Sequence, residues 1–178
     1  AFFDITASPI IDSDGNITSC MEIVRNVTDR KRVESALADS EAKYRTVVES
    51  SLVGVYIIQD GLFRFVNQRW CDIYGYSREE AVDRLDPVDL TPEEDRDRVR
   101  ENIRKRISGE VKTLEYDIRA IRKSGDIIHI RILGSTMTYR GRPAISGTII
   151  DITEQVRMEE TLRAGEAKMR SIVENIGI

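Results

Sequence analysis

The sequence predicts an α+β fold, in which a five-stranded antiparallel sheet carries helices on one face and amphipathic helices flank the domain. Two short β-rich segments joined by a tight turn open the pattern, helix-start signals follow, and three longer β-rich segments close it. The β-rich segments are residues 54–59, 62–67, 113–122, 127–139 and 144–153. Because two strands precede the helices and three follow them, the helices are expected to cover a single face of the sheet.

The first two strands are predicted to form a hairpin around Asp60-Gly61. Asp-Gly is a preferred pair for a two-residue hairpin turn, because both turn positions require a positive φ angle. The sheet therefore opens with an antiparallel pair of strands.

Two helices are predicted after this hairpin. Ser77-Arg78-Glu79-Glu80 and Thr91-Pro92-Glu93-Glu94 both match the capping-box pattern, the second with a proline at the first helical position. The second helix carries Val99, Ile103 and Ile107 on one face among charged residues and ends at a Ser-Gly pair. We expect this thin apolar stripe to cover the sheet.

Composition narrows the class of protein. The 178 residues include 27 Lys and Arg against 31 Asp and Glu, which gives a formal net charge of −4. No basic field is present to attract nucleic acid, and no uncharged stretch reaches the roughly 20 apolar residues of a membrane helix. We therefore expect no nucleic acid and no direct membrane contact. Cys20 and Cys71 match no disulfide or metal pattern, which favours the cytoplasm.

The two ends of the chain resemble each other. Val27-Thr28-Asp29 aligns with Ile152-Thr153-Glu154, and the same offset aligns Glu41-Ala42-Lys43 with Glu166-Ala167-Lys168. A period this long corresponds to a whole domain and its linker. We expect the sequence to be a piece of a tandem array in a longer protein.

The matched segments are predicted to be helices with an apolar seam. Alternating spacings of four and three residues are typical of the a and d positions of a coiled coil. The seam positions are Val33, Leu37, Ser40, Tyr44 and Val47 in the first helix and Met158, Leu162, Gly165, Met169 and Ile172 in the second. We expect a homodimer through these linker helices; in the alternative interpretation, each helix lies on its own domain.

Several short motifs follow one another along the chain in a fixed order. They are Gly54, Asp60-Gly61, Phe65-Val66-Asn67, Tyr74-Gly75-Tyr76-Ser77-Arg78-Glu79-Glu80, Arg122-Lys123-Ser124-Gly125, Gly141, Gly147 and Asp151-Ile152-Thr153-Glu154. In this order and spacing they resemble the PAS sensory domain family, of the S-box type found in tandem in bacterial and archaeal signalling proteins. The resemblance implies a five-stranded sheet with a cleft between the sheet and the helical segment.

The resemblance also implies a division of the chain. The expected parts are the C-terminal strands of a preceding PAS repeat (1–28), a linker helix (29–51), a complete PAS domain (40–155), and an outgoing linker helix with the start of a following repeat (154–178). In the family the exit motif couples the last strand to the outgoing helix. Here Thr153 can cap that helix and Asp151 can bond nearby groups, so these two residues are candidates for signal coupling. The alternative is a helix cap without a signalling role.

Few residues of the sequence could catalyse a reaction or bind a cofactor or metal. His129, the single histidine, lies in a predicted strand between two isoleucines, where we expect a packed or solvent-facing ring. Haem-binding relatives with a helix histidine would need one at residues 91–108, which contain none, and Cys71 lies outside the Asn-Cys-Arg-Phe-Leu-Gln run of flavin-binding light sensors. We expect neither haem nor flavin, no metal, and no catalytic residue.

The predicted cleft remains as a place for an unknown small molecule. The candidate ligand-binding residues are Ile57, Phe65, Trp70, Ile73, Tyr74, Val99, Ile103, Tyr116, Ile118 and Ile132. A filled core without a ligand would require the same residues, and a register slip of one residue would reverse the face of any strand.

The expected function is that of a sensory or signal-relay module that passes a change from the sheet to a coiled-coil linker helix. The expected parent is a sensor histidine kinase with neighbouring PAS repeats and a C-terminal output domain. Two alternatives stay open, a structural dimerisation spacer without a ligand and a regulatory module of a cyclic-dinucleotide enzyme.

Overall fold

A computed structural model describes residues 1–13 and 15–176, with side chains described as far as residue 170. The chain divides into two compact units, Ala1–Val47 and Val48–Ile178, and each is described by itself. Residues 177–178 of the predicted outgoing segment, and the side chain of the predicted seam residue Ile172, lie outside the described residues.

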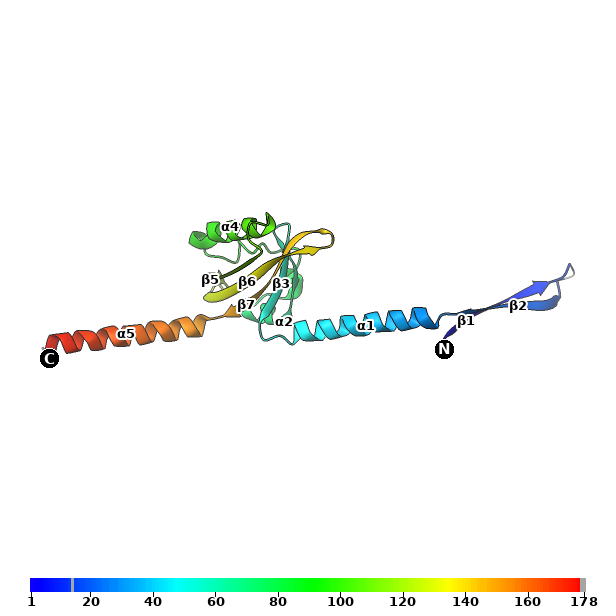
Figure 1. The fold of residues 1–178 in the computed structure, drawn as a ribbon, viewed down its shortest axis with the longest axis horizontal. Coiled ribbons are helices and arrows are strands. Elements are labelled where there is room, and N and C mark those ends of the chain that lie inside the picture. Colours follow the sequence, from blue (N-terminus) through cyan, green and yellow to red (C-terminus); the bar gives the residue numbers. More distant parts are fainter. Residues whose placement is uncertain (14, 177–178) are drawn as a thin grey trace. The chain divides into compact units, whose positions relative to one another are not determined.

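The first unit contains a hairpin and a helix. Strands β1 (Phe3–Ile11) and β2 (Ile17–Asn26) pair antiparallel, with Phe3 opposite Asn26, and helix α1 (Thr28–Glu49) follows at once (Figure 1). Every residue of the two strands is exposed. The hairpin therefore has no apolar core of its own.

The second unit is the predicted α+β domain (Figure 1). Its elements are β3 (Gly54–Gln59), β4 (Leu62–Val66), α2 (Gln68–Tyr74), α3 (Arg78–Ala81), the 3-10 helix η1 (Glu93–Asp95), α4 (Arg96–Ile107), β5 (Thr113–Ile121), β6 (Ile127–Tyr139), β7 (Arg142–Asp151) and α5 (Thr153–Ile176).

The five strands form one antiparallel sheet in the order β4-β3-β7-β6-β5. The predicted hairpin is confirmed, since Asp60 and Gly61 have φ angles of 55° and 77° between β3 and β4. The last strand, β7, lies in the middle of the sheet and pairs with both β3 and β6. The residue that leaves the sheet toward α5 is therefore connected to both halves of it.

The two predicted helix starts have different outcomes. Ser77 forms the predicted capping box with Glu80 at the start of α3, which is only 4 residues long. The prediction at Thr91 was wrong, because its hydroxyl donates to the carbonyl of Pro87 and makes no cap. Helix α4 begins after a 3-10 turn, and the carboxylate of Asp95 at its N-cap accepts a bond of 2.7 Å from Arg119 instead.

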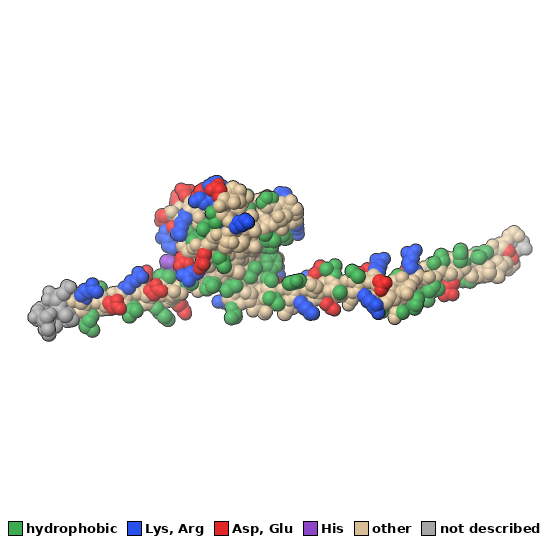
Figure 2. Space-filling model, in the orientation of Figure 1, with side chains coloured by type: hydrophobic (Ala, Val, Ile, Leu, Met, Phe, Trp, Pro, Cys, Tyr) green, Lys and Arg blue, Asp and Glu red, His purple; other side chains and the backbone are tan. Residues whose placement is uncertain are grey.

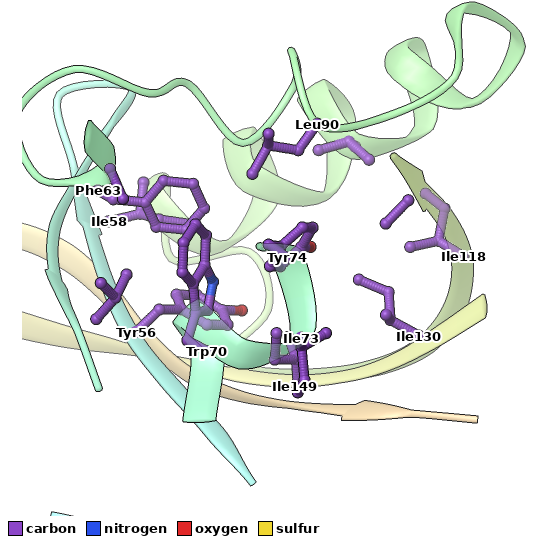
Figure 3. Packing of buried hydrophobic residues seen from close by; sticks show 14 of the residues in the cluster. Tyr56, Ile58, Phe63, Trp70, Ile73, Tyr74, Leu90, Ile118, Ile130 and Ile149 are labelled. Atoms are coloured by element: carbon purple, nitrogen blue, oxygen red, sulfur yellow. The ribbon is translucent and has the colours of Figure 1, made fainter. Parts of the chain in front are cut away.

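Helix α2 was not predicted, although its signals stand in the sequence. Asn67 caps its first turn, Gly75 ends it with a φ of 80°, and Trp70, Ile73 and Tyr74 form its buried face. Together with α4, this helix packs on one face of the sheet, where the apolar core lies (Figure 3). The opposite sheet face carries cross-strand ion pairs such as Arg131 with Asp117.

The flanking helices α1 and α5 occupy the segments predicted for linker helices, and both present apolar side chains to solvent (Figure 2). The exposed fractions are 59% for Leu37, 65% for Leu162 and 64% for Met169. Of the helices in the described part of the chain, none combines the length and apolar character that crossing a membrane requires.

Candidate functional site

A small cavity lies in the core between the sheet and helices α2 and α4. Its volume is about 30 Å³. A cavity of about 10–15 Å³ is enough for one water molecule, so this one has room for somewhat more than a single water. Its lining comprises Tyr56, Ile58, Phe63, Trp70, Tyr74, Pro87, Thr91, Val99, Ile103, Arg106, Tyr116, Ile118, Ile130, Ile132 and Ile149.

Aromatic rings fill one side of this cavity. The ring centroids of Phe63 and Trp70 are 4.9 Å apart and those of Trp70 and Tyr74 are 4.6 Å apart, while Tyr56 meets Phe63 edge-on at 6.0 Å (Figure 3). Trp70 is completely buried. Contacts of this kind join β3, β4 and α2 into one packed layer.

Seven of the ten candidate ligand-binding residues line the cavity. They are Trp70, Tyr74, Val99, Ile103, Tyr116, Ile118 and Ile132. Ile73 is buried in the surrounding core, whereas Ile57 and Phe65 are half-buried and do not line the cavity. The prediction that the side chains of Ile57 and Phe65 face the cleft was therefore wrong. On β3, Tyr56 and Ile58 on either side of Ile57 face the cavity, as strand alternation requires. On β4, an extra residue between Phe63 and Phe65 leaves Phe63 facing the cavity and turns Phe65 away.

Sequence reasoning missed Arg106, a charged residue that is only 1% exposed. Its Nε donates to the carbonyl of Asn102 at 2.9 Å, and its Nη2 donates to the Tyr116 hydroxyl at 3.4 Å. Among the described residues, its Nη1 has no hydrogen-bond partner. The apolar spacing of Val99 and Ile103 was the available signal for this helix face, and Arg106 follows Ile103 at the next position of the same stripe.

Two tyrosines that line the cavity, Tyr56 and Tyr74, stay neutral. Burial raises the pKa of Tyr56 to about 12, although the neighbouring Arg106 charge acts in the opposite direction. Burial also raises the pKa of Tyr74 well above its ordinary value. Both hydroxyls are therefore uncharged donors and acceptors at neutral pH.

A second set of hydrogen-bonded polar residues lies where strand β7 ends and helix α5 begins. The Asp151 carboxylate accepts the backbone N–H of Thr153 at 2.9 Å through Oδ1, and Arg122 donates to its Oδ2 at 2.6 Å. Partial burial raises the pKa of Asp151, but the hydrogen bonds from Thr153 and Arg122 outweigh it and hold the pKa below its ordinary value. The carboxylate thus joins the end of β5 to the first residue of α5.

Thr153 is tied to a second strand. Its hydroxyl accepts the backbone N–H of His129 on β6 at 3.0 Å, and it also hydrogen-bonds with the Asp151 carboxylate. The Ile152 N–H donates to the His129 carbonyl at 2.9 Å. Asp151, rather than the Thr153 hydroxyl, therefore meets the first backbone N–H of the helix, and His129 takes part through its backbone.

The same hydrogen bonds occur in the first unit, where β2 turns into α1. The Thr28 N–H donates to Asn26 Oδ1 at 3.0 Å, and the Thr28 hydroxyl accepts the N–H of Phe2 at 2.8 Å. Phe2 and Asn26 thus have the places of His129 and Asp151.

Asn67 fixes the end of the incoming helix and was not predicted as a site residue. Its side chain is completely buried, and its Nδ2 donates to the carbonyls of Val48 at 2.8 Å and Val53 at 3.1 Å. Its Oδ1 accepts the N–H groups of Val55 and Trp70. One side chain therefore connects the end of α1, strand β3 and helix α2.

The other candidate residues show neither a reactive thiol nor a group of metal ligands in the described part of the chain. Cys71 is buried, and burial raises the pKa of its thiol. Within the described residues, no three His, Cys, Asp or Glu side chains are grouped in a way that could hold a metal ion.

Comparison with known proteins agrees with this architecture. The family model described as "PAS fold" matches residues 42–152, and a second one, described as "PAS domain", matches residues 1–29. A curated relative, the probable diguanylate cyclase DgcE of Escherichia coli K12, is 29% identical over 127 residues. That match covers 70% of this chain and only 11% of the relative.

Solved structures share the fold. A PAS domain of an HTR-like protein from Haloarcula marismortui has a TM-score of 0.60 at 21% identity, covering 68% of this chain and 99% of that one. A sensory box histidine kinase/response regulator from Burkholderia thailandensis has a TM-score of 0.55 at 22% identity, covering 72% and 98% of the two chains. Since a PAS family model accounts for more than half of the residues, the chain belongs to the PAS domain family.

Proposed function

We propose that this chain is a sensory and signal-relay module of a larger signalling protein, and that it passes a change in its sheet to helix α5. The observation that carries this proposal is the Asp151 carboxylate, which binds both Arg122 at the end of β5 and the first residue of α5. A displacement of β5 or β6 relative to β7 would strain these bonds, and the start of the helix would follow.

The connections support a continuous path. Asn67 binds the end of α1, Glu49 accepts hydrogen bonds from the Gln68 N–H at 3.0 Å and from Arg78 at 2.7 Å, and α2 packs into the core through Trp70. From the core, the central strand β7 leads to α5. Both helices are thus attached to the same packed layer.

We further propose that the chain forms a homodimer through α1 and α5. Leu37 and Leu162, with 59% and 65% of their surface exposed, belong to apolar seams that have the spacing of a coiled coil. Pairing the seams would remove this apolar surface from water.

For the parent protein we propose a sensor histidine kinase with further PAS repeats before and after this domain and a C-terminal output domain. The match of residues 1–29 to a PAS model supports a preceding repeat. A cyclic-dinucleotide enzyme is the alternative parent, supported by the diguanylate cyclase relative. The free thiols of Cys20 and Cys71 are compatible with the proposed cytosolic location.

A second candidate function is that of a structural dimerisation spacer. The small volume of the core cavity, about 30 Å³, favours it, because drug-sized ligands occupy pockets of about 300–1,000 Å³. A spacer would need the seams and the packed core, but no coupling at the β7–α5 junction.

The test uses the full-length signalling protein with Asp151→Ala and Thr153→Ala. We expect either variant to change the output rate, kinase or cyclase, by at least about fivefold while the domain stays folded. The matched control is Asp117→Ala, which removes a carboxylate that binds Arg131 at 2.7 and 2.8 Å between β5 and β6 and, among the described residues, forms no hydrogen bond or ion pair with α5. Unchanged output in both junction variants would refute the relay and leave the spacer.

A further inference from the structure

No carboxylate among the described residues pairs with the buried guanidinium of Arg106, whose neighbours are the Tyr56 hydroxyl, the Asn102 carbonyl and the hydroxyl and ring of Tyr116, the ring centroid lying 5.8 Å away. The Nη1 of Arg106 is buried without a partner among the same residues. Arginine remains protonated in proteins, and buried charges are normally paired. The exposed neighbour on the same helix, Arg104, pairs with Glu101 at 2.8 Å, so acidic partners are available to this helix outside the core.

Two glycines form the sheet surface beneath the Arg106 guanidinium and the Tyr56 hydroxyl, and this surface is called the Gly134–Gly147 floor. Gly134 of β6 and Gly147 of β7 lie directly opposite each other in the sheet. A Cβ at position 134 would collide with Nη1 of Arg106 and would lie 3.2 Å from the Tyr56 hydroxyl. A Cβ at position 147 would lie 2.5 Å from the same hydroxyl. The absence of two side chains thus brings the Arg106 guanidinium and the Tyr56 hydroxyl together above the sheet.

The polar groups that meet there are all donors toward an anion. Arg106 offers its unpartnered Nη1, and Tyr56 offers a hydroxyl that burial keeps protonated. Both residues line the core cavity, whose other lining is aliphatic and aromatic apart from Tyr74, Tyr116 and Thr91. A ligand that suits this cavity has one negatively charged end and a short apolar remainder.

We propose that the core cavity is a binding site for a small carboxylate, held by Arg106 and Tyr56 above the Gly134–Gly147 floor. One carboxylate oxygen accepts from Nη1 of Arg106, and the Tyr56 hydroxyl donates to the carboxylate. Because the cavity holds only about 30 Å³, the ligand has few heavy atoms, on the scale of formate or acetate. This names the ligand class of the sensor proposed above, and its signalling role rests on that proposal, whereas the binding itself does not.

The test measures binding of sodium formate and sodium acetate to the 178-residue chain by calorimetry and by amide chemical shifts, against sodium chloride at equal ionic strength. We expect saturable binding of a carboxylate, with shifts concentrated at Tyr116, Gly134 and Gly147. Arg106→Gln should abolish it, and Tyr56→Phe should weaken it at least about tenfold. The matched control Arg100→Gln removes an exposed arginine of the same helix that pairs with Asp97 and should bind like the original chain.

A third variant covers the case in which Arg106→Gln does not fold. Gly134→Ala keeps every polar group but displaces the guanidinium, so it should also lose carboxylate binding. No saturable binding of either carboxylate to the folded chain, equal binding of chloride, or unchanged binding in Gly134→Ala and Tyr56→Phe would each overturn the proposal. Because this readout is binding to the isolated chain, it is separate from the output assay that tests the relay.

Discussion

The two strand–helix junctions differ in their surroundings far more than in their hydrogen bonds. At both, an Asx side chain accepts the N–H of a threonine two residues later, and the threonine hydroxyl accepts an N–H from the adjacent strand. Asn26 is exposed and neutral, whereas Asp151 is half-buried and paired with Arg122.

The hydrogen bonds of the β7–α5 junction come from a short motif, whereas its ion pair and its burial come from the surrounding domain. The bond from the Asx side chain to the threonine N–H spans only two residues and needs no domain, and the threonine hydroxyl needs only one neighbouring strand. The charge pair and the burial of Ile152, which is 7% exposed, come from β5 and the rest of the sheet. In the proposed relay, only the junction that a domain holds in this way would transmit a change.

The largest expected effect tests whether the β7–α5 junction depends on the packed domain around it. Trp70→Ala should destabilise the second unit by about 3–5 kcal/mol, because it removes a completely buried side chain from the core. Hydrogen exchange at the β7–α5 junction should then accelerate, while exchange at the β2–α1 junction stays unchanged. Equal acceleration at both junctions would show that they do not belong to separate units.

Removing the Asx side chain should affect the two junctions unequally. Asp151→Ala should cost about 1–3 kcal/mol, since it also leaves Arg122 without its partner. Asn26→Ala should cost about 0.5–2 kcal/mol, as expected for a lost helix cap. Chemical denaturation and hydrogen exchange in the first turns of α5 and α1 measure the two effects. A larger loss at Asn26 would reverse our ranking.

The helices that follow the two junctions can be compared through dimerisation. Leu37→Glu in α1 and Leu162→Glu in α5 should each weaken the proposed dimer at least about tenfold, which corresponds to about 1.4 kcal/mol. Ala38→Glu and Ala164→Glu add the same charge at exposed positions outside the seams and serve as controls. Sedimentation equilibrium measures the dissociation constants, and a monomeric parent chain at high micromolar concentration would contradict the prediction.

The smallest expected effect is a response to acid. The pKa of Asp151 is lower in the folded protein than its ordinary value, so its stabilising contribution is complete above about pH 4 and is lost as the pH falls through the lowered folded pKa. Asn26 does not titrate. NMR shifts of the Thr153 amide should therefore change below about pH 4, and those of Thr28 should not. Asp151→Asn, which copies the first junction, should abolish the change; a titration that persists in it would assign the response to another group.

Local sequence signals predicted most of the fold. Asp60-Gly61 set the hairpin, Ser77 and Glu80 set a helix start, and the five strands lie within a few residues of their predicted bounds. These features depend on neighbouring residues, so a sequence pattern contains them. Thr91 failed as a cap because its hydroxyl donates to the Pro87 carbonyl, and helix α4 starts only after the 3-10 turn.

The site was predicted less completely, for reasons that lie in tertiary structure. An extra residue in β4 between Phe63 and Phe65 turns Phe65 away from the cavity, and Ile57 pairs with Phe65 on that outer face, while Tyr56 and Phe63 line the cavity. Arg106 is a charged residue, and its burial depends on Gly134 of another element, where a side chain would collide with the guanidinium. Neither effect can be obtained from periodicity within one segment.

The position of β7 in the sheet has a mechanical consequence. Tension along α5 reaches the sheet through Asp151, at the end of a strand that pairs with β6 from Arg142 to Asp151 and with β3 from Ile145 to Ile149. Such a pull loads two ladders of hydrogen bonds in shear, so that many bonds share the force. At the other junction, a pull on α1 loads the single ladder between β2 and β1. The sheet of the domain therefore resists a pull on α5 more strongly than the β1–β2 hairpin resists a pull on α1.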